Sequence, residues 1–195
     1  MTKIIGITGG IASGKSTVVA EIKKHGYQVI DADQVVHELQ AKGGKLYQAL
    51  CNWFGSEILQ ENGELDRKKL GQLIFSSKDM LEKSSHLQNV IIREELARRR
   101  DELAKTQDVF FMDIPLLIEH DYMEWFDDIW LVHLDEKTQL ERLVMRNYFS
   151  KEEAKKRMAS QMSTEAKKPY ADKLLDNSGD LTELKAQINQ LLQEL

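Results

Sequence analysis

Several features are scarce in this chain of 195 residues, and each scarcity excludes a class of protein. Cys51 is the only cysteine, so an internal disulfide is excluded and a thiolate metal site is disfavoured, as fits a reducing compartment. With Pro115 and Pro169 as the only prolines, the chain has no proline-rich linker. No apolar run approaches the ~18 residues of a membrane span, and the N-terminus has too few apolar residues for a signal peptide. We therefore expect a cytoplasmic protein that does not bind membranes.

Basic residues are also in the minority, with 27 Lys and Arg against 32 Asp and Glu and a net charge of −5. The densest basic run is Arg98-Arg99-Arg100, and Glu94 and Glu95 stand four residues before its first two members. This spacing is typical of a solvated helix face. The composition therefore predicts no nucleic-acid partner.

The stretch GITGGIASGKST, residues 6–17, contains the pattern Gly9-x-x-x-x-Gly14-Lys15-Ser16. It follows an apolar run and opens a helical segment at 15–24, as a phosphate-binding loop does. Glycines let backbone N–H groups turn inward around phosphates, Lys15 adds a positive charge, and Ser16 offers a hydroxyl to Mg²⁺. We predict a site for a nucleoside triphosphate and Mg²⁺. Its residues are Gly10, Ile11, Ala12, Ser13, Gly14, Lys15, Ser16 and Thr17.

Short apolar runs alternate with longer helical patterns along the chain. Runs of this kind are typical of buried parallel strands, and their alternation with helices predicts an α/β fold with a parallel sheet covered on both faces. The candidate strands are Ile4–Thr8, Tyr27–Ile30, Val109–Met112 and Ile129–Leu134, with the weaker Lys173–Leu175.

The chain from Ile30 to Val109 is far longer than one crossover helix requires. It contains the helical patterns QVVHELQAK, KLYQALCNWFG and DRKKLGQLIF and a long one over 78–105, with Asp66 as an N-cap. We predict a helical sub-domain that grows from the end of the second strand.

A second charged segment, residues 136–168, contains two helical patterns joined at Asn147-Tyr148-Phe149. Ser150 and Glu153 form an S-x-x-E capping pattern. Few apolar residues anchor this hairpin, which suits a mobile lid, although a fixed surface hairpin is the alternative. The apolar stripe of Leu181–Leu195 indicates core packing.

Acidic residues end two of the predicted strands. Asp113 closes VFFMD, where a phosphate-loop protein holds magnesium; alternatively it is a strand-end acid that faces solvent. Asp31 and Asp33 in VIDAD stand two apart, so on a strand they share a side and can position an acceptor hydroxyl and take its proton. The alternative for Asp33 is the cap of a helix that begins at Gln34.

Arg142 and Arg146 lie four residues apart on the first helix of the hairpin and therefore share a face. Their guanidinium groups suit phosphoryl oxygens and can arrive as a lid closes, or they can serve solubility alone. Asp172 and the DNSG segment at 176–179 follow the last strand and indicate either a turn or a loop that contacts a purine.

The sequence resembles the dephospho-CoA kinases, a family of P-loop kinases, over nearly its whole length. The motifs that carry the resemblance are GITGGIASGKST, VIDADQVVHEL, DIPLLIE, the helix with Arg142 and Arg146, Gln161 in SQMS, and ADKLLDNSG. The resemblance implies a five-stranded parallel nucleotide-kinase core over 1–33, 106–135 and 169–195. It also implies a helical acceptor-binding domain over 34–105 and a lid over 136–168.

The implied reaction is ATP-dependent phosphorylation of the 3′-hydroxyl of dephospho-CoA, the last step of coenzyme A synthesis. By resemblance, Lys15 and Ser16 serve phosphate and Mg²⁺, with Asp113 at the metal, and Asp33 is the base. Arg142 and Arg146 become lid contacts, and the adenine site includes Asn177 and Gly179. The chain has Asn89-Val90 where many members have His-Pro, so no acceptor contact is carried over there. We expect a monomer or a weak homo-oligomer.

Three alternatives remain at this point. The nearest is another small-molecule kinase of the same build, of the nucleoside monophosphate or shikimate type. A GTP-driven switch would need an N-K-x-D guanine motif after the phosphate loop, which the sequence lacks. The third alternative is a scaffold protein that binds ATP without catalysis, and a test for turnover distinguishes it from a kinase.

Overall fold

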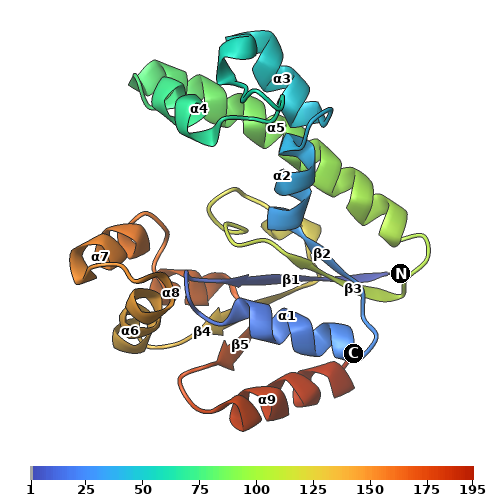
Figure 1. Cartoon of the computed structure of the whole chain (residues 1–195). Coiled ribbons are helices and arrows are strands. Elements are labelled where there is room, and N and C mark those ends of the chain that lie inside the picture. The colour runs from blue at the N-terminus through green and yellow to red at the C-terminus, as the bar shows by residue number, and fades with distance from the viewer. Residues whose placement is uncertain (1) are drawn as a thin grey trace. The chain divides into compact units, whose positions relative to one another are not determined.

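The computed structural model describes residues 2–195, and the chain divides into two compact units (Figure 1). The core unit combines the chain up to Asp31 with Leu103–Leu195, and the helical unit spans Ala32–Glu102. Each unit has its own buried apolar residues, as separate units require.

An all-parallel sheet of five strands in the order β2-β3-β1-β4-β5 forms the centre of the core unit. The strands predicted from the sequence are all present, and the α/β fold class is confirmed. β2 is the shortest strand, with three residues, and Tyr27 just before it packs its ring edge-on against Phe111, with 5.5 Å between the ring centroids. The strands are β1 (Lys3–Gly9), β2 (Val29–Asp31), β3 (Val109–Asp113), β4 (Asp128–His133) and β5 (Lys173–Asp176).

Helices α1 (Lys15–Lys24) and α9 (Leu181–Gln193) pack beside each other against one face of this sheet (Figure 1). Their apolar stripes meet the inward side chains of the central strands, where Phe111 and Trp130 contact edge to face at 5.2 Å. Burial of each large apolar side chain contributes about 1.5–3 kcal/mol, so this layer fixes the sheet and the start of α1 together. The α9 residues in this layer are Leu184, Ile188 and Leu192.

Residues 114–126 pack against β1, where a Cβ on Gly6 would collide with Leu117 and Phe126. The Thr8 hydroxyl donates to the Pro115 carbonyl at 3.0 Å, and the buried Lys167 ammonium donates to the same oxygen at 3.2 Å. Lys167 also forms an ion pair of 3.0 Å with Glu119. These bonds attach this segment both to β1 and to α8 (Thr164–Lys167).

The helical unit consists of α2 (Ala32–Gln40), α3 (Lys45–Phe54), α4 (Arg67–Ile74) and most of α5 (Lys78–Leu103). Asp66 caps α4 as predicted, because its carboxylate accepts from the N–H groups of Lys68 and Lys69. The buried residues of the unit include Val35, Leu39, Leu46, Leu50, Ile58, Leu70 and Leu96.

Helices α6 (Glu136–Asn147) and α7 (Lys151–Ala159) form the predicted hairpin within the core unit (Figure 1). Ser150 caps α7 by accepting from the Glu153 N–H, as predicted. The Glu153 carboxylate pairs with Arg157 at 3.0 Å. Leu143 of α6 and Ala154 of α7 are fully buried, so each helix of the hairpin has one apolar side chain that anchors it.

Candidate active site

The phosphate loop, residues 9–16, connects the end of β1 to the first turn of α1. Ala12 and Gly14 have positive φ angles of 58° and 87°. The Ser13 N–H donates to the Gly10 carbonyl at 3.1 Å. Left-handed residues in such a turn direct successive N–H groups into a concavity that binds anions, and the N-terminus of α1 opens beside them.

Lys15 forms an ion pair with Asp113 through its Nζ and the Asp113 Oδ1. Asp113 is 6% exposed and ends β3, where it stands opposite Ile7 of β1 and Asp31 of β2 in the sheet register. The alternative in which Asp113 faces solvent is therefore wrong. A lysine and two carboxylates lie at the carboxyl edge of the sheet, where open α/β sheets bind ligands.

Asp33 is exposed in the first turn of α2, because that helix begins at Ala32. The prediction that Asp31 and Asp33 share a side of a strand is wrong, since β2 ends at Asp31. The alternative in which Asp33 caps a helix from Gln34 is also wrong. An acid in the first turn of a helix is nevertheless favoured by the helix dipole.

Asn177, in the segment for which the sequence indicates either a turn or a purine contact, lies against the phosphate loop. Its buried side chain donates from Nδ2 to the Ser13 carbonyl at 2.8 Å. A Cβ on Gly14 would collide with this amide, so glycine is required there both for its φ angle and for space. Gly179 precedes α9, whose capping box joins Asp180 to Glu183.

Two glutamines that are not among the predicted site residues also hold the loop, although Gln161 belongs to one of the motifs that carry the family resemblance. Gln139 of α6 donates from Nε2 to the Ile11 carbonyl at 2.7 Å, and Gln161 accepts from the Ile11 N–H at 3.2 Å. No local pattern could have found these contacts, because the partners are more than a hundred residues apart.

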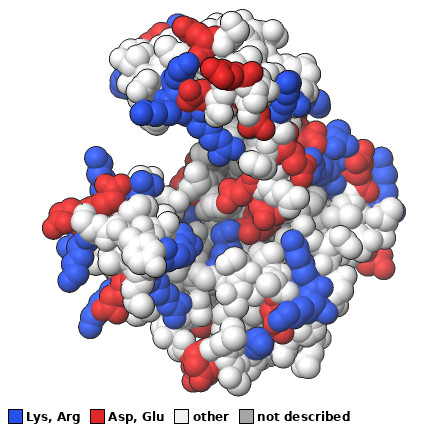
Figure 2. Space-filling view, in the orientation of Figure 1, with Lys and Arg blue, Asp and Glu red and all other residues white. Residues whose placement is uncertain are grey.

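Arg142 and Arg146 both lie on α6, as predicted, with Arg142 half-buried and Arg146 exposed. Arg146 donates from Nε to the Asn147 side chain at 2.9 Å. Figure 2 shows basic and acidic side chains interspersed on the visible surfaces of the hairpin and of the helical unit. The hairpin therefore presents both signs of charge on that face.

The predicted solvated face of α5 is only partly present. Glu95 is buried, and its carboxylate accepts hydrogen bonds from Arg98 and Arg99.

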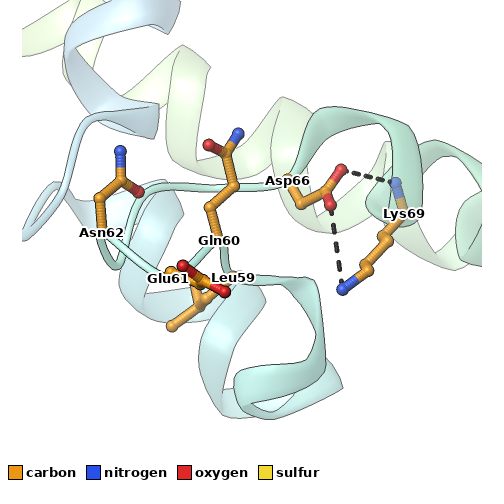
Figure 3. A pocket seen from close by; sticks show the side chains of 6 residues that line it. All are labelled: Leu59, Gln60, Glu61, Asn62, Asp66 and Lys69. Carbon is orange, nitrogen blue, oxygen red and sulfur yellow. Dashed lines mark hydrogen bonds and ion pairs between the residues drawn. The ribbon is translucent and has the colours of Figure 1, made fainter.

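The helical unit has a shallow polar hollow of about 590 Å³ (Figure 3). Its Asp66 is used as the cap of α4 and pairs with Lys69 at 4.0 Å, so we assign the hollow no ligand.

Among residues 2–195, no three His, Cys, Asp or Glu side chains gather so as to hold a metal ion. In the same part of the chain, none of the helices is both long and apolar enough to cross a membrane.

Known proteins are similar to this chain over its whole length. The family model for dephospho-CoA kinase matches residues 3–183. A dephospho-CoA kinase from Streptococcus mutans serotype c is 62% identical over 195 residues, which are 100% of this chain and 98% of the relative.

Solved structures agree with this similarity. A Thermus thermophilus protein superposes with a TM-score of 0.81 at 32% identity, covering 100% of this chain and 98% of its own. A dephospho-CoA kinase from Campylobacter jejuni gives 0.76 at 25% identity, with 100% and 97% covered. The likeness therefore extends well beyond the phosphate loop.

Proposed function

Because the chain belongs to the dephospho-CoA kinase family, we propose that it transfers the γ-phosphoryl group of ATP to the 3′-hydroxyl of dephospho-CoA. The products are coenzyme A and ADP. The single observation that carries the proposal is a phosphate loop whose Lys15 meets a strand-end acid, Asp113, in a chain that matches this family from end to end.

Phosphoryl transfer passes through a transition state with negative charge on the phosphoryl oxygens. Lys15 and the N–H groups of the phosphate loop are the donors that we place against these oxygens, since a loop of this shape before a helix presents donors to an anion. In this structure Lys15 is paired with Asp113. In the ATP complex its ammonium exchanges that carboxylate for phosphate oxygens.

Ser16 and Asp113 are the residues that would hold Mg²⁺. A hydroxyl and a carboxylate fit this ion, which prefers oxygen donors and takes few protein ligands beside substrate phosphates. Asp113 ends the strand next to β1, and Ser16 lies in the first turn of α1. When bound, the ion supplies positive charge that neutralises the triphosphate.

We assign the acceptor to the helical unit and to Asp33 at its first turn. A ribose hydroxyl has a very high pKa, so a carboxylate that orients it or receives its proton assists the attack on phosphorus. Because the transition state is loose and the proton leaves late, orientation by Asp33 matters at least as much as its basicity.

Arg142 and Arg146 are proposed to complete the site from the α6–α7 hairpin acting as a lid. Charge that arrives only on closure favours the transition state over the bound substrates. The Asn177–Gly179 loop is proposed to border the adenine base. Because the Asn177 amide is bonded to the Ser13 carbonyl, we assign it the role of holding this segment against the phosphate loop.

An acceptor panel with ATP and Mg²⁺ tests the proposed function. We expect dephospho-CoA to be phosphorylated with a kcat/KM far above those of AMP, CMP and shikimate. Mass spectrometry shows the addition of one phosphoryl group, and NMR of the product locates it on the 3′-oxygen. Equal or better turnover of any of the other three acceptors would refute the assignment, and binding of ATP without turnover of any acceptor would favour a scaffold.

A further inference from the structure

Ile11 of the phosphate loop is held on both sides by glutamine side chains. Its N–H donates to the Gln161 Oε1 at 3.2 Å, and its carbonyl accepts from the Gln139 Nε2 at 2.7 Å. We propose that Gln139 and Gln161 are positioning residues that keep the loop in its phosphate-binding conformation before ATP arrives. This inference rests on the proposed function only in that the loop binds ATP.

The two bonds fix two successive peptide groups. The Ile11 N–H belongs to the peptide that joins it to Gly10, and its carbonyl belongs to the peptide that joins it to Ala12. Ala12 has a φ of 58°, a left-handed conformation that is strained for a residue with a Cβ. The Gln139 bond therefore orients the peptide that leads directly into the strained residue.

Strain of this kind has a purpose in an anion site. The left-handed Ala12 and Gly14 turn the N–H groups of the loop inward, and without external bonds Ala12 would relax toward the right-handed region. A loop that relaxes must be reordered when the triphosphate binds, which lowers its affinity. The glutamine pair, by fixing Ile11, reduces this reordering.

The Gln139 bond to Ile11 also explains why residue 10 is a glycine. A Cβ at Gly10 would lie 2.6 Å from the Gln139 Nε2 and 3.1 Å from the Thr164 Oγ1. The phosphate-loop pattern requires glycine at 9 and 14 but not at 10. Glycine at 10 therefore leaves the space through which Gln139, only 8% exposed, reaches the Ile11 carbonyl.

Both glutamines come from the ends of the α6–α7 hairpin. Gln139 lies in the first turn of α6, and Gln161 follows the last turn of α7. A cavity of about 420 Å³ adjoins them and is lined also by Leu134, Leu140 and Met158. A methionine side chain is close to glutamine in length and can pack against these apolar residues, so each substitution removes one bond to Ile11 and adds no new polar group to the site.

The first experiment removes each bond and measures ADP binding, which needs no acceptor. Gln139→Met and Gln161→Met are titrated with ADP and Mg²⁺ by calorimetry, beside Gln190→Met at an exposed position of α9 as the matched control. A net hydrogen bond is worth about 0.5–1.5 kcal/mol, so we expect the Kd for ADP to rise about 2- to 10-fold in each glutamine variant. The KM for dephospho-CoA at saturating ATP should stay at the control value.

The double variant tests whether the two bonds act on one element. Since both hold Ile11, loss of either frees much of the loop, and the combined rise in Kd should be smaller than the product of the single rises. A Kd for ADP equal to that of the control in both single variants would overturn the proposal. So would a parallel rise in the KM for dephospho-CoA, because that outcome indicates a general disturbance of the fold.

The second experiment uses the direction of each bond. The Ile11 N–H requires an acceptor, which Gln161→Glu retains, whereas the Ile11 carbonyl requires a donor, which Gln139→Glu loses. Each variant adds one negative charge near the loop, so the comparison between them cancels most of the charge effect. We expect Gln139→Glu to weaken ADP binding several-fold more than Gln161→Glu. Equal weakening would overturn the proposal, while the acceptor panel on the unaltered protein judges the proposed function separately.

Discussion

Replacement of Glu95 by glutamine should loosen the helical unit in a way that depends on pH. The Glu95 carboxylate is 6% exposed and accepts from Arg98 at 2.7 and 3.0 Å and from Arg99 at 2.9 Å. The Lys45 ammonium lies 3.7 Å away, and Arg99 also pairs with Glu38 at 2.5 Å. The buried Glu95 charge therefore links α5 to α3 directly, and it links α5 to α2 through Arg99.

The size of the effect follows from the pKa of Glu95. The hydrogen bond from Arg98 lowers this pKa most, burial opposes it, and Arg99 adds to the lowering, so that the pKa falls from 4.5 to about 2. This difference corresponds to about 3 kcal/mol at neutral pH. Because Arg98 is 49% exposed and screened by water, we expect Glu95→Gln to reduce the free energy of unfolding by about 2 kcal/mol.

The sign of the pH dependence is fixed by the direction of the shift. The folded-state pKa lies below that of the unfolded chain, so the stabilisation is fully present above pH 4.5 and is lost as the pH falls toward 2. The gap between the original protein and Glu95→Gln should therefore be widest near pH 7. It should narrow by roughly 1 kcal/mol near pH 3.5.

Urea unfolding followed by circular dichroism at these two pH values measures the gap. Hydrogen exchange on peptides from α2, α3 and α5 shows whether the helical unit is the part that opens. Glu94→Gln is the matched control, since Glu94 is an exposed neighbour on the same helix. Equal stability of Glu95→Gln and Glu94→Gln at pH 7, or a gap that does not narrow in acid, would show that the Glu95 charge does not hold the unit together.

Two further predictions concern the transfer step. Asp33→Asn should lower kcat by at least roughly 10²-fold, because it removes the carboxylate charge that assists the attack. The melting temperature and the Kd for ATP should stay nearly unchanged. A stable, fully active variant would show that Asp33 has no part in the mechanism. Arg142→Ala and Arg146→Ala should each lower kcat more than they weaken ATP binding measured without acceptor, because their charge acts on closure. Unaltered kcat/KM in both variants would make the hairpin a surface feature only.

Local patterns predicted the parts of the fold that depend on neighbouring residues in the chain. The phosphate loop was predictable because its geometry needs glycine and lysine at fixed spacing, and the strands because both faces of the sheet are buried. The position of Asp113 followed from the end of its apolar run. Its ion pair with Lys15 could not be derived, since it depends on β1 and β3 being adjacent in the sheet.

Errors arose where a tertiary contact decides the local structure. VIDAD reads as a longer strand by alternation, but β2 pairs with β3 over only three residues, and α2 begins at Ala32. Spacing alone placed Glu95 on a solvated face, because its charged partners at three and four residues are those of an exposed helix. The packing of α2 and α3 on α5, which no spacing reveals, buries the carboxylate.

The side chains that hold the phosphate loop are uncharged, and the chemistry of the site accounts for this choice. A carboxylate beside the loop would repel the triphosphate, and a lysine or arginine would compete for its oxygens. An amide offers both a donor and an acceptor and carries no net charge. The amides of Gln139, Gln161 and Asn177 therefore bind the loop backbone, and Lys15 supplies the positive charge at the loop. The charged side chain of Asp113 pairs with Lys15 itself and is the group proposed to pass to Mg²⁺. Neutral groups thus hold the backbone of the loop, while the two charged groups, Lys15 and Asp113, are paired with each other and are the ones proposed to exchange partners when ATP and Mg²⁺ bind.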